Sequence, residues 1–325
     1  MKKLKIGVLG AGHLGKIHIQ CILAQADLFD FIGFYDPNEQ NVNATITKFD
    51  VKAFNDINDL IEACDMIDIV TPTVTHFELA RQVIEAGKHV FIEKPITNTV
   101  AEAEILLALA EKQGVKIQVG HVERFNPAFL ALGDTPLQPM FIEAHRLAEF
   151  NPRGTDVSVV LDLMIHDLDI VLHAVKSDIK QVHASGVCIV SATPDIANAR
   201  IEFENGCVAN LTASRISFKQ MRKIRLFQPD AYISLDFFEK NAQIIRLYEK
   251  GSAEVPDIDT LLELETQQGT KMIHFQAPDI VPVNAIQLEL ASFRTAILEN
   301  TRPIVNGKDG YKALKAAYMV LDAMK

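Results

Sequence analysis

Short apolar runs and longer amphipathic stretches alternate along the first third of the chain. The runs have the length of buried strands, and the stretches between them repeat apolar residues at helical spacing. Strands that alternate with helices form a parallel sheet covered by helices. The sequence therefore predicts an α/β domain with a doubly wound parallel sheet over residues 1–121. Strands are expected at 4–9, 31–35, 66–70, 89–92 and 115–119, and helices after residue 12 and at 57–64, 76–86 and 101–113.

The pattern changes after residue 121. Residues 157–175 form one apolar stretch of helical length, and several later segments alternate with the period of two that is typical of strands. We therefore expect residues 122–325 to form an α+β domain with a large, mainly antiparallel open sheet. Its strands are expected at 140–148, 181–190, 197–203, 207–214, 224–227, 231–237, 243–248 and 271–276, and two closing helices at 284–299 and 308–324.

A glycine-rich turn, Gly10-Ala11-Gly12-His13-Leu14-Gly15, follows the first predicted strand. Gly10 permits the tight turn, Gly12 leaves room for a pyrophosphate beside the main chain, and Gly15 lets the next helix pack closely on the strand. The N-terminus of that helix then offers free N–H groups to the phosphates. This strand–turn–helix context predicts a dinucleotide-binding site.

Asp36, at the end of the second strand, indicates which dinucleotide binds. A carboxylate at this position accepts hydrogen bonds from the ribose hydroxyls and repels a 2′-phosphate. Residues 37–40 contain no arginine or lysine that could bind such a phosphate. NAD is therefore predicted rather than NADP, although Asp36-Pro37-Asn38 also fits an ordinary turn.

Composition excludes several classes of partner. The net charge is −10, and no basic block is present to neutralise a nucleic-acid backbone. No apolar run approaches the ~20 residues of a membrane span. The four cysteines lie in apolar stretches without the spacing of a zinc site, so buried thiols in a reducing compartment are expected. We expect a cytoplasmic protein that binds neither nucleic acid nor a membrane, and no metal.

The helix at 157–175 carries one polar stripe on an otherwise apolar surface: Asp162, His166, Asp169 and His173. Spacings of four, three and four place them on one helical face. Polar groups in a buried helix need partners, so the stripe faces a ligand cleft, a structural network or solvent. A shared metal ion also fits these residue types, but no cysteine cluster supports it.

Lys94 lies at the carboxyl edge of the predicted sheet, directly before Pro95. Ligands of such sheets bind at that edge, although most isolated lysines are solvated surface charges.

With these motifs the chain resembles the Gfo/Idh/MocA family of NAD(P)-dependent sugar dehydrogenases over essentially its whole length. The resemblance rests on the glycine turn, Thr71-Pro72 with His76, residues 87–95 and residues 162–167. It implies a cis peptide bond at 94–95, a homodimer or homotetramer formed through the second-domain sheet, and a catalytic set of Lys94, Asp162 and His166. The cofactor-binding residues are then expected to be Gly10, Gly12, His13, Leu14, Gly15, Asp36, Thr71, Pro72, His76, Glu93 and Lys94.

Residues 120–128, Gly-His-Val-Glu-Arg-Phe-Asn-Pro-Ala, resemble the branch of the family that oxidises UDP-N-acetylglucosamine at carbon 3. The resemblance implies hydride transfer from a secondary hydroxyl of a nucleotide sugar. We expect His166 to be the base, since imidazole titrates near neutrality, Lys94 to bond the reacting oxygen, and Asp162 to orient the site. The expected substrate-binding residues are His121, Glu123, Arg124, Asn126, Arg153 and His166.

Three other functions remain open at this point. A free polyol such as myo-inositol could be the substrate. A regulator could bind NAD without catalysis, but loss of Lys94 or His166 would favour that class, and both are present. A hydrolase or epimerase could retain NAD and return the hydride in each cycle.

Overall fold

The computed structural model describes residues 2–151, 157–253, 255–256, 261–267 and 269–325. The chain divides into two compact units, which are described separately below. The first unit comprises residues 1–125 and 284–315, and the second comprises 126–283 and 316–325. The division predicted from the sequence, 1–121 and 122–325, differs in that it assigns residues 122–125 and 284–315 to the second domain.

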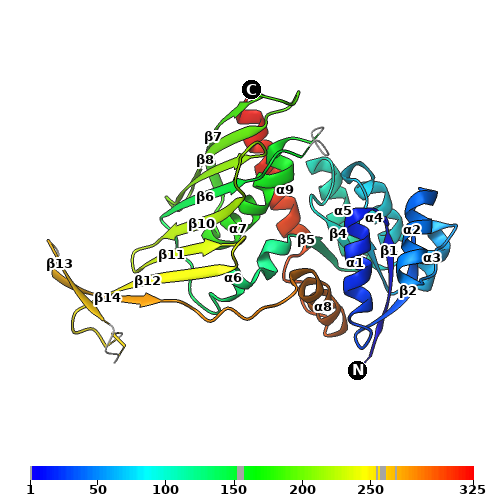
Figure 1. The fold of residues 1–325 in the computed structure, drawn as a ribbon, viewed down its shortest axis with the longest axis horizontal. Helices are drawn as coiled ribbons and strands as arrows, with labels where there is room; N and C mark the ends of the chain where they lie inside the picture. The colour runs from blue at the N-terminus through cyan, green and yellow to red at the C-terminus, as the bar shows by residue number, and fades with distance from the viewer. Residues whose placement is uncertain (1, 152–156, 254, 257–260, 268) are drawn as a thin grey trace. The chain divides into compact units, whose positions relative to one another are not determined.

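The first unit contains a five-stranded sheet in the order β2-β1-β3-β4-β5, in which every pairing is parallel (Figure 1). The predicted doubly wound parallel sheet is confirmed. The strands are β1 (Leu4–Leu9), β2 (Phe29–Tyr35), β3 (Met66–Ile69), β4 (His89–Glu93) and β5 (Ile117–Gly120). The helices are α1 (His13–Leu23), α2 (Glu39–Phe49), α3 (Ile57–Ala63), α4 (His76–Glu85), α5 (Val100–Gln113), α8 (Ala285–Leu298) and the first part of α9 (Gly307–Ala323), with short 3-10 turns η1 (Thr73–Thr75) and η2 (Val122–Phe125).

Both faces of this sheet are covered. Ile6 and Val8 of β1 are fully buried in a cluster that includes residues of α1 and α8. Gly7, which points to the opposite face, lies against Leu60 and Cys64, in and just after α3. Alternate residues of one strand therefore pack on helices from opposite sides, as expected for a strand in a doubly wound sheet.

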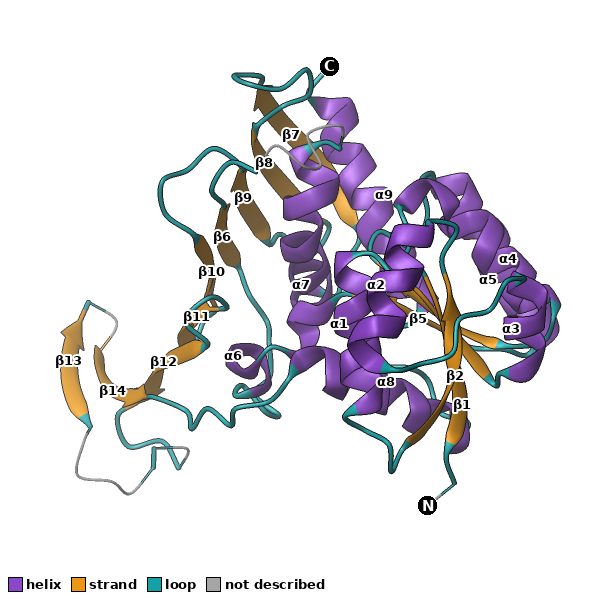
Figure 2. Cartoon of the chain, turned by 45° about the vertical axis from the view of Figure 1, so that its right-hand side comes forward, coloured by secondary structure: helices purple, strands orange, loops and turns teal. Residues whose placement is uncertain are grey.

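The second unit contains a nine-stranded sheet in the order β13-β14-β12-β11-β10-β6-β9-β8-β7, and α7 lies along one face of it (Figure 2). Only the β6–β9 pairing is parallel among those described, so the predicted mainly antiparallel sheet is confirmed. The strands are β6 (Phe141–Leu147), β7 (Ile179–Val187), β8 (Ile196–Phe203), β9 (Val208–Ser214), β10 (Met221–Phe227), β11 (Ala231–Asp236), β12 (Asn241–Glu249), β13 (Leu262–Thr266) and β14 (Gly269–Gln276). Helix α6 (Pro127–Leu130) and helix α7 (Ile165–Val175) also belong to this unit.

Helices α2 and α6 and strand β13 were not expected from the sequence, and two further features differ from the expectations. The expected helix at 157–175 is instead a π-helical turn, η3 (Val160–Met164), that continues into α7. π-helical turns are rare and are frequently found at functional sites. Cys188 is exposed, whereas the other three cysteines are buried as expected. In the described part of the chain, no helix is long and apolar enough to cross a bilayer.

Candidate cofactor pocket and active-site residues

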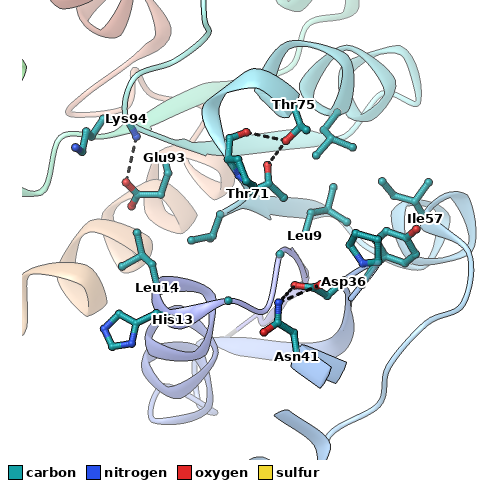
Figure 3. A pocket seen from close by; sticks show the side chains of 17 residues that line it. Leu9, His13, Leu14, Asp36, Asn41, Ile57, Thr71, Thr75, Glu93 and Lys94 are labelled. Atoms are coloured by element: carbon teal, nitrogen blue, oxygen red, sulfur yellow. Dashed lines mark hydrogen bonds between the residues drawn. The ribbon is translucent and has the colours of Figure 1, made fainter. Parts of the chain in front are cut away.

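A pocket of about 660 Å³ lies at the carboxyl ends of the strands in the first unit (Figure 3). Strands β2, β1, β3 and β4 contribute to it in that spatial order, through Asp36, the glycine turn, Thr71 and Glu93. Such sheets bind ligands at this edge, where the chain order reverses. The predicted cofactor residues that line it are Gly10, Gly12, His13, Leu14, Asp36, Thr71, Pro72, Glu93 and Lys94.

The glycine turn has the geometry that a pyrophosphate requires. Gly10 has a φ of +95°, which side chains rarely adopt. A Cβ on Gly15 would lie 2.0 Å from the Gly10 carbonyl oxygen, so only glycine permits this close packing, whereas a Cβ on Gly12 would meet nothing within 4 Å. The space beside Gly12 and the N-terminus of α1 together fit a dinucleotide phosphate.

Asp36 is held in place by its own neighbourhood. Its carboxylate accepts the Ala11 N–H at 2.7 Å and the Asn38 N–H at 2.8 Å, and Asn41 donates its side-chain amide to both carboxylate oxygens at 3.2 and 3.3 Å (Figure 3). The turn interpretation and the cofactor interpretation of residues 36–38 are therefore compatible. A preoriented carboxylate at the end of β2 suits ribose hydroxyls and repels a phosphate.

Glu93 and Lys94 lie across the pocket from Asp36 (Figure 3). The Lys94 N–H donates to Glu93 Oε2 at 3.1 Å, and the Lys94–Pro95 bond is cis as expected. The Glu93 carboxylate contacts a buried histidine, since His18 Nε2 lies 3.2 Å from Glu93 Oε1. Although burial raises the pKa of Glu93, hydrogen bonding and charge from His18 lower it below its usual value.

His76 lies behind the pocket wall and is absent from its lining. The ring is 1% exposed, and its two nitrogens lie 2.9 Å from the carbonyl oxygens of Pro95 and Thr71. Burial lowers its pKa in spite of these two contacts. His76 thus connects the loop after β3 to the turn that carries Lys94.

The polar stripe of the second unit is divided between different environments. Asp162 in η3 and His166 in α7 are half-buried, whereas Asp169 is buried and His173 is exposed. The sequence did not single out Asp167, which forms a buried two-pronged ion pair with Arg146 of β6, the closest contact being 2.8 Å. No group of three or more potential metal ligands occurs among the described residues.

The predicted substrate residues between β5 and α6 are buried. His121, Glu123 and Arg124 are at most 5% exposed. Asn126 caps α6 through the Ala128 N–H at 3.0 Å and donates its amide to the Phe237 carbonyl at 3.0 Å, which gives its side chain a structural role. Arg153 lies outside the described residues.

Sequence reasoning missed several residues at the pocket. Asn41, which orients Asp36, could have been found from Asn38, whose side chain caps a helix that was not predicted. His18 and Asp68 come from separate elements and carry no spacing signal. The pocket is also lined by Leu9, Tyr35, Pro37, Ile57, Val70, Thr75 and Leu79.

Comparison with known proteins shows two matched regions. Residues 4–121 match the Gfo/Idh/MocA oxidoreductase family with an NAD-binding Rossmann fold, and residues 138–231 match the C-terminal domain of the same family. The chain is 34% identical to UDP-N-acetylglucosamine 3-dehydrogenase of Acidithiobacillus ferrooxidans, over 100% of this chain and 98% of that protein. It is 24% identical to the NAD⁺-dependent scyllo-inositol 2-dehydrogenase of Bacillus subtilis, over 93% of this chain and 96% of that protein.

Solved structures agree with this result. A structure of the Acidithiobacillus ferrooxidans enzyme superposes with a TM-score of 0.88, at 34% identity and with coverage of 99% of this chain and 98% of that one. The resemblance inferred from the motifs is confirmed, as is the prediction of an NAD-binding dehydrogenase. This chain belongs to the Gfo/Idh/MocA family of NAD-binding oxidoreductases.

Proposed function

We propose that this protein oxidises the 3-hydroxyl of a UDP-linked amino sugar, of which UDP-N-acetylglucosamine is the first candidate. The observation that carries the proposal is full-length similarity, at 34% identity, to an enzyme named for that substrate. Similarity to the scyllo-inositol enzyme is lower, at 24%. The motif at residues 120–128, found in the sequence alone, points to the same branch.

The residues of the pocket fit a bound NAD. Gly10, Gly12 and Gly15 would hold the pyrophosphate at the N-terminus of α1, and Asp36 would hold the adenosine ribose. Glu93 and Lys94 then flank the nicotinamide half, because β4 lies on the opposite side of the glycine turn from β2. When bound, the cofactor supplies a hydride acceptor.

The remaining steps fall to three side chains of the chain. We assign removal of the hydroxyl proton to His166, a group that titrates near neutral pH in its unperturbed form. Lys94 donates a hydrogen bond to the reacting oxygen and stabilises the negative charge that develops there. Asp162 orients the substrate hydroxyl or the lysine.

A substrate panel tests the proposal. Purified protein is supplied with NAD and, separately, with UDP-N-acetylglucosamine, other UDP-sugars, myo-inositol and glucose, and NADH formation is followed. Turnover of UDP-sugars alone supports the proposal, and turnover of myo-inositol alone overturns it. Protein that carries NAD through purification and releases no NADH would instead be the hydride-returning hydrolase or epimerase. Lack of NADH formation without retained NAD would indicate a regulator.

The Asp36 carboxylate is expected to set the preference for NAD. Replacing Asp36 with serine and Pro37 with arginine should lower kcat/KM with NAD about 10- to 100-fold, because hydrogen bonds to a charged acceptor are lost. The same variant should gain activity with NADP. Steady-state kinetics give the ratio of kcat/KM with NAD to kcat/KM with NADP. A ratio within threefold of wild type would show that Asp36 does not set the cofactor preference. Asn43→Ala, on the adjoining helix α2 and absent from the pocket lining, is the control.

We further propose that the protein is a cytoplasmic homodimer or homotetramer that associates through the second-unit sheet. A partly exposed aromatic ladder of Phe141, Phe227 and Tyr232 crosses β6, β10 and β11, with centroid distances of 5.9 and 5.1 Å. Uncovered aromatic clusters of this kind are typical of interfaces. Sedimentation velocity reports the mass, and a monomer at micromolar concentration would overturn this assembly.

The buried free thiols of Cys21, Cys64 and Cys207 support a reducing compartment.

A further inference from the structure

A buried cluster of three ionisable side chains lies under the Lys94 end of the cofactor pocket. His18 of α1 is at its centre, with Nδ1 at 2.8 Å from Asp68 Oδ2 and Nε2 at 3.2 Å from Glu93 Oε1. The side chains of His18 and Asp68 are 0% exposed, and that of Glu93 is 12% exposed. The cluster therefore extends from the interior of the sheet to the pocket surface.

The position of the ring indicates its charge. His18 Nδ1 is hydrogen-bonded to Asp68, whereas Nε2 lies at ion-pair distance from Glu93 without hydrogen-bond geometry. The contact with Glu93 is therefore an attraction between charges, which an imidazolium supplies and a neutral imidazole does not. Burial lowers the pKa of His18, but the carboxylates of Asp68 and Glu93 raise it well above its usual value. Burial raises the pKa of Asp68, and the positive charge of His18 opposes that rise, so a cationic ring favours the ionised form of both carboxylates.

The surrounding elements leave Glu93 little freedom. A Cβ on Gly120 of β5 would lie 2.7 Å from the Glu93 carboxylate, so β5 closes one side. The second carboxylate oxygen accepts the Lys94 N–H. Phe91 packs edge-on against the His18 ring at a centroid distance of 5.9 Å. Glu93 is thus fixed between two backbone elements and the histidine.

We propose that His18 is a positioning residue that keeps Glu93 ionised and fixed beside the nicotinamide site, so that the pocket favours NAD⁺ over NADH. The oxidised ring carries a positive charge and the reduced ring does not. A fixed carboxylate in the pocket wall therefore stabilises the oxidised form selectively. The inference rests on the NAD pocket alone and does not depend on which sugar is the substrate.

Three other titratable groups lie near His18, Asp68 and Glu93. Lys94 follows Glu93, His76 lies behind Pro95, and Cys21 lies on the same helix as His18. The positive charge of Lys94 opposes the effect of Glu93 on the nicotinamide ring. The ionisation of Glu93 therefore decides whether the electrostatic potential at that ring favours a cation.

The first test measures dissociation constants of NAD⁺ and NADH by titration calorimetry, without substrate. Glu93→Gln should weaken NAD⁺ relative to NADH by about tenfold. His18→Gln should shift the ratio in the same direction at neutral pH, because Glu93 loses the charge and the contact that lower its pKa. Raising the pH should then restore part of the NAD⁺ preference in His18→Gln.

Charge compensation distinguishes positioning from general structural support. His18→Gln combined with Asp68→Asn removes one positive and one negative charge, so Glu93 stays ionised and the NAD⁺/NADH ratio should return to within about threefold of wild type. A purely structural role would lower affinity for both cofactors equally, with no recovery in the double variant, and this outcome would overturn the proposal. His89→Gln removes another histidine, which lies at the start of β4 away from the pocket lining, and is the matched control.

A direct measurement covers the case in which the variants do not fold. Nitrogen-15 NMR of the wild-type protein at neutral pH should show His18 protonated on both nitrogens. A neutral His18 tautomer would overturn the proposal even if the substrate panel supports the proposed activity. Conversely, a doubly protonated His18 with no turnover of any sugar would contradict the proposed function alone.

Discussion

Replacing Lys94 with methionine should lower kcat about 100- to 10,000-fold, the range typical of losing a group that assists proton transfer or stabilises a developing charge. Methionine keeps the unbranched stem and removes the ammonium group. Lys94 lies at the end of the pocket opposite Asp36, so NAD⁺ should still bind through the glycine turn and the ribose contact. Stopped-flow hydride transfer and calorimetric NAD⁺ binding, measured on the same preparation, separate the two effects.

Three controls sharpen this result. Lys94→Arg keeps the charge but loses the compact amine, and it should remain at least about tenfold slower than wild type. Lys112→Met changes an exposed lysine near the end of α5 and should leave kcat unchanged. His166→Asn should lower kcat by a similar factor to Lys94→Met. The double variant should have a kcat only slightly below that of the less active single variant, because the two groups serve one step. A Lys94→Met enzyme with kcat within tenfold of wild type would remove Lys94 from the catalytic set.

Local signals in the sequence predicted most of the cofactor pocket. Gly10 and Gly15 are required by backbone geometry within a single turn, and Gly12 lies in the same motif. Asp36 directly follows β2 and Glu93 ends β4, and both strands are recognisable as short apolar runs. Because all parallel strands end at one edge, the strand pattern was enough to bring residues distant in sequence together.

Features that depend on long-range contacts or on weak patterns were missed. Helix α2 buries only Thr45, so its apolar periodicity is faint, and all five residues of β13 are exposed. The pair His18–Asp68 spans 50 residues, and nothing in either local sequence identifies the partner. The polar stripe was predicted from a regular helical period, which the π-helical turn at Val160–Met164 interrupts.

Asp167 shows this limit most clearly. It lies outside the predicted stripe, next to His166, yet it bonds to the sheet through Arg146 on β6. The alternation of β6 places Arg146 on the buried face among apolar residues, where a charge is unexpected without a partner. Each residue alone predicts a partner, but only the fold identifies the pair.

Breaking this pair should produce the largest loss of stability among the substitutions considered. Both side chains are at most 3% exposed, so Arg146→Met leaves the Asp167 carboxylate buried without its counter-charge. Removing one partner of a buried ion pair typically costs about 3–5 kcal/mol. Arg200→Met breaks a pair whose side chains are 45% and 34% exposed, and it should cost less than about 1 kcal/mol. Urea unfolding followed by circular dichroism compares the two.

Replacing both partners distinguishes the cost of an unpaired charge from the loss of packing. Arg146→Met with Asp167→Leu removes both charges of the pair, so the double variant should be more stable than Arg146→Met alone. Because Asp167 adjoins His166, Arg146→Met should also lower kcat at temperatures well below its unfolding transition. The double variant should regain stability but not kcat. Equal free energies of unfolding for Arg146→Met and Arg200→Met would show that burial does not make the loss of Arg146 costly, and would contradict this prediction.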